Sequence, residues 1–191
     1  MANKSAPQGF KPINATGGPY NGATQRVYIP TTSTTTDIFI GDVVKVRGSA
    51  STDGYPTVDI VGATTDIPSG VIVSFEPNRG DLSVQYGKKG TARYAAMVNV
   101  ENQLFEIETN AVMDAGDVGM NVDYALTAGS TVTGYSAYAV IGGNVSTSAG
   151  DVLQIVAFVD RPDNDLTLTN AKVIVRFNDS FNKIGRTGVA S

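Results

Sequence analysis

The sequence predicts an all-β protein: a compact β-barrel or β-tulip-like body preceded by an extended N-terminal arm. Turn-forming residues recur about every 8–12 residues along most of the chain, which is typical of β-sandwiches and barrels. The runs between these turns are short and rich in β-branched residues, as strands are. No window of about 11 residues has the periodicity of an amphipathic helix of normal length. A jelly roll, which needs a similar chain length, is the alternative architecture.

Residues 1–36 are interpreted as the extended arm. This segment holds four of the eight prolines and two turn signals, Gly17-Gly18-Pro19 and Asn21-Gly22. It shows no sustained strand or helix periodicity apart from the brief run 26–29. A disordered terminus is the alternative. Spaced aromatic residues favour docking against a neighbouring molecule, because rigid rings add contact area at a small entropic cost; they are Phe10, Tyr20 and Tyr28.

Residues 37–184 are predicted to form the β-barrel body, followed by a C-terminal tail at 185–191. The first body strand, 37–47, contains a Gly-Asp break in its middle, and glycine there is expected to mark a corner of a tightly curled sheet. Residues 111–120 could supply one helical turn. The other expected strands are 57–61, 71–75, 82–86, 93–100, 104–108, 125–126, 137–141, 152–159 and 171–177.

The triplet Gly-Asp-Val occurs three times, beginning at Gly41, Gly116 and Gly150. Carboxylates in loops are the ligands that calcium prefers, so a calcium site is one interpretation. The copies have no fixed period, however, and no DxDxDG loop is present. We therefore expect turns, in which glycine adopts an unusual φ and aspartate accepts hydrogen bonds from the backbone.

The composition argues against several classes of function. The chain has no histidine, the usual proton shuttle near neutral pH, and no cysteine. With 14 basic and 18 acidic residues, it offers no broad positive face for nucleic acid. Its N-terminus lacks the apolar core of a signal peptide, and no apolar stretch is long enough to span a membrane. Charged residues make up only 17% of the chain, so the surface is covered by small polar residues or buried against partners.

Carboxylate pairs are the only acid–base groups that could support catalysis, for example the hydrolysis of a glycoside. Asp163 and Asp165 are interpreted as caps of a turn, and Glu106 and Glu108 as a solvated strand face. No S-x-x-K motif, phosphate-binding loop or metal-ligand spacing is present. We therefore expect no catalytic residue, no metal and no cofactor, and the protein is predicted not to be an enzyme.

The order of motifs resembles that of tailed-bacteriophage capsid cement or decoration proteins, which stabilise the phage head. The similarity extends from about residue 9 to about residue 188. Its most specific parts are the arm GFKPINATGGPYNG, the strand FIGDVVK and the turn VDRPDND.

This resemblance implies a virion protein on the outer surface of the capsid, which binds the major-capsid shell and bridges neighbouring capsomers. It also implies a small symmetric homo-oligomer, for which a homotrimer is preferred and a dimer is possible, and no partner among nucleic acids or membranes. Under this hypothesis the arm supplies the contacts, with aromatic rings filling pockets and Arg26 pairing with a carboxylate of the shell. The candidate contact residues are Phe10, Pro12, Tyr20, Arg26 and Tyr28.

The main alternative function is that of a carbohydrate- or surface-binding β module. Tyr124, Tyr135 and Tyr138 could then line a shallow platform for a sugar, although packing on a strand face is the simpler interpretation. The absence of tryptophan argues against this alternative.

Overall fold

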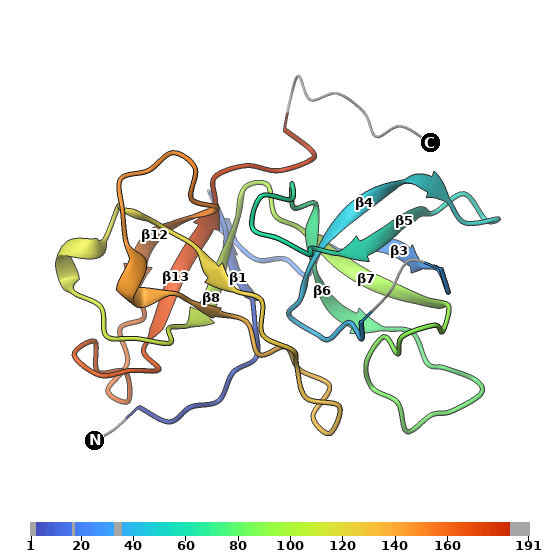
Figure 1. Cartoon of the computed structure of the whole chain (residues 1–191), viewed down its shortest axis with the longest axis horizontal. Helices are drawn as coiled ribbons and strands as arrows, with labels where there is room; N and C mark the ends of the chain where they lie inside the picture. Colours follow the sequence, from blue (N-terminus) through green and yellow to red (C-terminus); the bar gives the residue numbers. More distant parts are fainter. Residues whose placement is uncertain (1–2, 17, 33–35, 184–191) are drawn as a thin grey trace.

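The computed structural model describes residues 3–16, 18–32 and 36–183, and it confirms the predicted all-β fold with a barrel. Five strands form a closed barrel in the order β3-β5-β4-β6-β7, on the right of Figure 1. The strands, in chain order, are β3 (Gln25–Ile29), β4 (Val43–Ala50), β5 (Pro56–Ile60), β6 (Gly70–Phe75) and β7 (Arg93–Asn99).

A six-stranded antiparallel sheet, which we call the large sheet, lies beside the barrel in the order β2-β1-β8-β13-β12-β9 (Figure 1). Its strands are β1 (Lys11–Ala15), β2 (Gly18–Pro19), β8 (Gln103–Glu108), β9 (Asn121–Val122), β12 (Leu153–Phe158) and β13 (Lys172–Phe177). β10 (Tyr124–Ala125) and β11 (Ala139–Val140) form a separate two-stranded sheet. In chain order, the whole barrel is therefore inserted between β2 and β8 of the large sheet.

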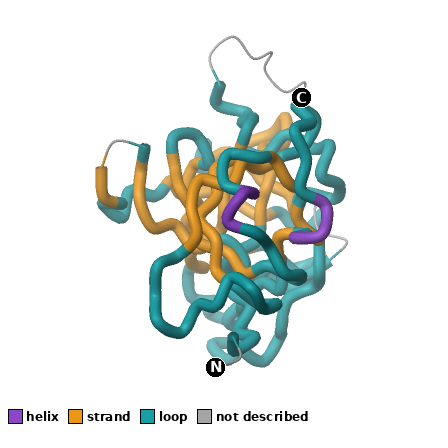
Figure 2. Tube along the Cα trace, turned by 90° about the vertical axis from the view of Figure 1, so that its left-hand side faces the viewer, coloured by secondary structure: helices purple, strands orange, loops and turns teal. Residues whose placement is uncertain are grey.

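Two single-turn 3-10 helices accompany the large sheet, as Figure 2 shows in purple. They are η1 (Ala115–Asp117) and η2 (Gly142–Asn144). The first confirms the helical turn predicted within 111–120. No helix in the described part of the chain is long and apolar enough to cross a membrane.

The barrel encloses a small apolar core because its strands alternate. On β3, Val27 and Ile29 are buried while their neighbours are partly exposed. Gly70 lets β6 approach β7 closely, since a Cβ at this position would stand 2.3 Å from the Met97 side chain. Closure of the barrel leaves no free edge in this part of the molecule.

A second core lies against the large sheet, and Phe10 is at its centre. The Phe10 ring is 1% exposed and lies 5.1 Å from the ring of Tyr124, 5.0 Å from that of Phe177 and 5.9 Å from that of Phe105. The three partner rings come from β8, β10 and β13, so Phe10 links the start of the chain to strands more than 90 residues away.

The prediction of a separate arm at residues 1–36 is wrong for the described part of that segment. β1 pairs with β8 from Lys11 to Ala15, and β3 completes the barrel between β5 and β7. The domain boundary expected at residue 37 therefore does not separate an arm from a body. The barrel takes only part of the predicted body 37–184, because β8 to β13 belong to the other sheets. The predicted tail 185–191 lies outside the described residues.

Residues 82–86 do not form the expected strand but lie in the loop 76–92. The backbone of this loop is held in place by Arg93, a residue that is only 8% exposed. Its guanidinium donates hydrogen bonds to the carbonyl oxygens of Glu76, Val84 and Tyr86 at 2.7, 3.1 and 2.6 Å. These carbonyls are satisfied by a side chain, so no neighbouring strand is required.

Two chain segments meet at a junction between the barrel and the large sheet, where Gly9 and Gly41 both have positive φ, +64° and +95°. The Phe10 amide donates to the Gly41 carbonyl at 3.0 Å. A Cβ on Gly41 would stand 2.1 Å from the Gln8 carbonyl oxygen, a separation that no side chain tolerates. The approach of the two backbones therefore depends on glycine at both positions.

Candidate interaction surface

Three tyrosines gather on the outer wall of the barrel, around the guanidinium of Arg26. Tyr28 on β3 is paired with Tyr94 on β7, and their ring centroids are 5.0 Å apart. Tyr55, just before β5, lies 5.9 Å from Tyr94 in an edge-on arrangement. The Arg26 guanidinium carbon is 3.9 Å from the centroid of the Tyr94 ring and 4.7 Å from that of Tyr55. We call Arg26, Tyr28, Tyr55 and Tyr94 the tyrosine platform.

Two carboxylates hold the platform in place. Arg26 donates to both oxygens of Glu76, with Nε–Oε1 at 2.5 Å and Nη2–Oε2 at 2.8 Å. These hydrogen bonds hold the pKa of Glu76 below its usual value and raise that of Arg26. The Tyr94 hydroxyl donates to Asp53 at 2.5 Å, which raises the pKa of the phenol. Each ring is half-buried, so the platform presents ordered aromatic surface to solvent.

The five predicted contact residues do not form one surface. Arg26 and Tyr28 belong to the platform, but Phe10 lies in the core. Pro12 is half-buried within β1, and Tyr20 is half-buried against the large-sheet core. Burial of Tyr20 raises its pKa. Arg26 already has a carboxylate partner, Glu76, within its own chain.

Four residues of the platform and its surroundings were not predicted from the sequence: Tyr55, Tyr94, Asp53 and Glu76. One signal was present for Tyr94, because it stands between two inward-facing residues of a recognised strand and must therefore face outward. Nothing in the sequence indicated that Tyr28 and Tyr55 would both contact Tyr94.

The predicted carboxylate pairs are in ion pairs or turns. Glu108 is 5% exposed and bonded to Lys172, and it also accepts hydrogen bonds from the Ser5 hydroxyl and the Ala6 amide at 3.1 and 3.0 Å. Glu106 pairs with Arg161 at 3.1 Å. The solvated strand face expected at Glu106 and Glu108 is therefore wrong, since chain segments cover it.

Asp163 and Asp165 were expected to cap a turn, and the hydrogen bonds of Asp165 fit this role. Its carboxylate accepts from the Thr167 amide at 3.0 Å and from the Thr167 hydroxyl at 2.7 Å, which lowers the pKa of Asp165. Asp163 is mostly exposed and lies 3.6 Å from Arg161.

The tyrosines considered for a sugar platform are separated by the fold. Tyr124 and Tyr138 are buried against each other, with ring centroids 5.6 Å apart, and burial raises the pKa of both. Only Tyr135 is well exposed, at 40%. These residues therefore do not form a shared surface.

The aspartates of the Gly-Asp-Val triplets all accept local hydrogen bonds, but the predicted turn holds only in part: Asp42 and Asp117 accept from the backbone as expected, and only Gly41 of the three glycines has a positive φ. Asp117 accepts from the Asp114 amide at 2.8 Å, and Asp151 from the Ser146 hydroxyl at 2.5 Å. Asp42 accepts from the Phe39 amide at 2.7 Å. Within residues 3–16, 18–32 and 36–183, no group of three acidic side chains is arranged to hold a metal ion.

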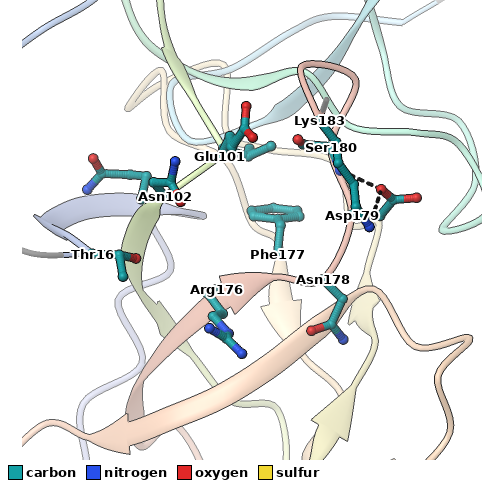
Figure 3. Close-up of a pocket in the computed structure, with 11 residues that line it drawn as sticks. Thr16, Glu101, Asn102, Arg176, Phe177, Asn178, Asp179, Ser180 and Lys183 are labelled. Carbon is teal, nitrogen blue, oxygen red and sulfur yellow. Dashed lines mark hydrogen bonds and ion pairs between the residues drawn. The ribbon is translucent and has the colours of Figure 1, made fainter. Parts of the chain in front are cut away.

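A shallow hollow of about 300 Å³ lies at the ends of β8 and β13, where Figure 3 shows the Phe177 ring among polar side chains. The segment after β13 crosses from here to the barrel, and the Phe181 amide donates to the Pro68 carbonyl at 2.8 Å. Asn178 Nδ2 donates to the Asp151 carbonyl at 2.9 Å. The hollow is therefore lined by a segment that connects the large sheet to the barrel, in addition to the junction at Gly9 and Gly41.

Asp42 is the most unusual ionisable group of the junction. Its side chain is 1% exposed, and Oδ1 has no hydrogen-bond partner among the described residues. Burial raises the pKa of Asp42 to about 7, although hydrogen bonds from Ser136 and the Phe39 amide oppose this shift. Nearby Tyr124 and Tyr138 are buried phenols that carry no compensating positive charge.

Replacing Asp42 by Asn is expected to stabilise the protein at alkaline pH. Folding raises the pKa of Asp42 from 3.8, so the wild-type free energy of unfolding falls as pH rises from about 4 through about 7. Asn keeps an acceptor for the Phe39 amide and carries no charge. Thermal melts at about pH 8 should give a higher Tm for Asp42→Asn than for wild type, and the gap should narrow as pH falls below about 7 and close near pH 4. Parallel pH profiles for the two proteins would contradict this prediction.

Comparisons of this chain with models of protein families, with curated proteins and with solved structures gave no match.

Proposed function

We propose that this protein is a bacteriophage capsid decoration protein, which binds the outside of the major-capsid shell and bridges neighbouring capsomers. The resemblance of its motifs to cement proteins suggests this role, and the tyrosine platform is the structural observation that supports it. Tyrosine and arginine are enriched among the residues that dominate protein–protein binding.

The platform suits a binding partner because its rings are already ordered. Tyr28 and Tyr94 stand on neighbouring strands of a closed barrel; Arg26 stacks on the Tyr94 ring, and Asp53 accepts a hydrogen bond from the Tyr94 hydroxyl. Little side-chain entropy is therefore lost on binding. A closed barrel also offers no free edge for strand addition, so the contact is made through side chains.

We propose a different role for Arg26 from the pairing with a shell carboxylate that was expected from the sequence. Arg26 is bonded to Glu76 on one side and stacked on Tyr94 and Tyr55 on the other. Its role in the proposal is to hold the rings, while the rings make the contact with the shell.

The test is co-sedimentation with empty heads assembled from the major-capsid protein encoded nearest to this gene. Tyr55→Ala and Tyr94→Ala should each weaken binding by about 2 kcal/mol, or about thirtyfold in Kd, as expected for central aromatic contacts. Leu82→Ala is the control, because Leu82 is 78% exposed and lies outside the platform. Thermal melts check that each variant remains folded.

A carbohydrate-binding module remains the second candidate, since the same rings could stack on a sugar with Asp53 and Glu76 as acceptors. A glycan array run on the same variants distinguishes the two. Glycan binding that Tyr94→Ala abolishes, with no binding to heads, would replace the proposed function. Undiminished head binding by both tyrosine variants would exclude the platform as the contact.

A further inference from the structure

The segment from Tyr124 to Gly150 contains no Asp, Glu, Lys or Arg, in a protein whose net charge is −4. A few residues of this segment are buried, but most of the loop 126–137 is exposed, and the loop projects from the region between the barrel and the large sheet, as the gold loop at the bottom of Figure 1 shows. The molecule thus has an uncharged projection on an otherwise acidic chain.

The projecting loop is ordered, and it ends in an exposed valine. The Ser130 amide donates to the Tyr135 carbonyl at 2.9 Å, and the Gly134 amide to the Ser130 carbonyl at 2.8 Å. At the base of the loop, the Ile40 amide donates to the Gly134 carbonyl at 3.0 Å, and the Ser136 amide donates to the Ile40 carbonyl at 2.8 Å. Val132, at the tip, is 87% exposed, the largest value among the exposed large hydrophobic residues described. The backbone hydrogen bonds of the loop therefore hold one apolar side chain, that of Val132, out in solvent.

A groove of about 520 Å³ lies at the base of the same loop, between it and residues 6–8. Ala6 and Pro7 line one wall, and Ala128, Tyr135 and Ala137 line the other. No acidic or basic side chain lines the groove. An aliphatic side chain can therefore enter it without desolvating a charge.

We propose that two copies of this chain associate about a twofold axis, with the Val132 tip of each copy inserted into the groove of the other. Because the tip and the groove belong to one loop, a single twofold operation fills both grooves at once, as an isologous interface requires. The copies share a negative net charge, and contact through the uncharged loop keeps like charges apart. This assembly does not rest on the proposed function.

The first test measures the mass of the full chain by sedimentation equilibrium over a range of concentrations. Wild type should be a dimer, and Val132→Asp should raise the dimer dissociation constant at least tenfold, because each tip would carry a charge into an apolar groove. Val112→Asp is the control: Val112 is 50% exposed outside this loop, and its replacement should leave the dimer intact. A monomeric wild type, a trimer, or a dimer unaffected by Val132→Asp would overturn the proposal.

The second test uses the absence of native cysteine to locate the contact. Chains with Pro7→Cys and chains with Val132→Cys are mixed under mild oxidation, so that a disulfide between the two positions must join different molecules. Non-reducing electrophoresis should show a cross-linked dimer that forms faster in the mixture than in either variant alone. Equal rates in all three samples would place the tip outside the groove of the partner. Neither measurement involves capsids, so a failure to bind heads leaves this result unaffected.

Discussion

Removing residues 1–30 is expected to unfold the protein. The deletion takes away β1, which pairs with β8 in the large sheet, and β3, which closes the barrel between β5 and β7. It also removes Phe10, and truncation of a buried phenylalanine to alanine alone costs about 3–5 kcal/mol. Since domains are stable by only about 5–15 kcal/mol, the combined loss exceeds what the remaining contacts can supply.

Circular dichroism melts and amide NMR spectra of residues 31–191 test this expectation. A chain that begins at Ser5 is the matched control, because it loses the hydrogen bonds of Asn3 to the 165–169 turn but keeps those of Ser5 and Ala6 to Glu108. The control should melt cooperatively, and the long deletion should show no cooperative transition. A cooperative melt for residues 31–191 would mean that the first strands are dispensable, as an independent arm would be.

Replacing Gly41 by Ala is expected to have the largest effect of any substitution of a single glycine by alanine at the junction. The new Cβ would stand 2.1 Å from the Gln8 carbonyl oxygen, on a residue whose φ is +95°. The left-handed conformation costs about 1–2 kcal/mol, and forced repacking adds about 1–3 kcal/mol, so the free energy of unfolding should fall by about 2–5 kcal/mol.

Gly54→Ala separates these two contributions. Gly54 has a φ of +81°, but a Cβ there meets no atom within 4 Å. Denaturant unfolding should therefore show a loss of about 1–2 kcal/mol for Gly54→Ala and a clearly larger loss for Gly41→Ala. Equal losses for the two variants would show that the backbone segments around Gln8 and Gly41 can move apart at little cost in free energy.

The strands that sequence patterns predicted well are those with a regular apolar face that is buried. β8 buries Phe105 and Ile107 on one face, and β13 buries Val173 and Val175 in the same way. β1 and β3 were misinterpreted because each has only five residues in a segment rich in proline and glycine. Their stability comes from pairing with β8 and β7, which lie far along the chain, and local patterns do not report such pairing.

The candidate surface could be predicted only in part for the same reason. The sequence singled out Arg26 and Tyr28, but the residues that complete the platform come from a turn before β5 and from β7. The closure of the barrel brings these segments together. Glu106 and Glu108 show the opposite error: their alternation was recognised, but the segments that cover their face come from residues 5–6 and 161–172.

The insertion of the barrel between β2 and β8 imposes an order on folding during synthesis. β1 leaves the ribosome first, but its partner β8 is made only after all five barrel strands. The barrel can close as soon as β7 emerges, whereas Phe10 must wait for Tyr124 and Phe177. The first strand to be translated is therefore among the last to complete its pairing: β2, made directly after β1, can pair with one edge of it, but the other edge has no partner strand until β8 is made.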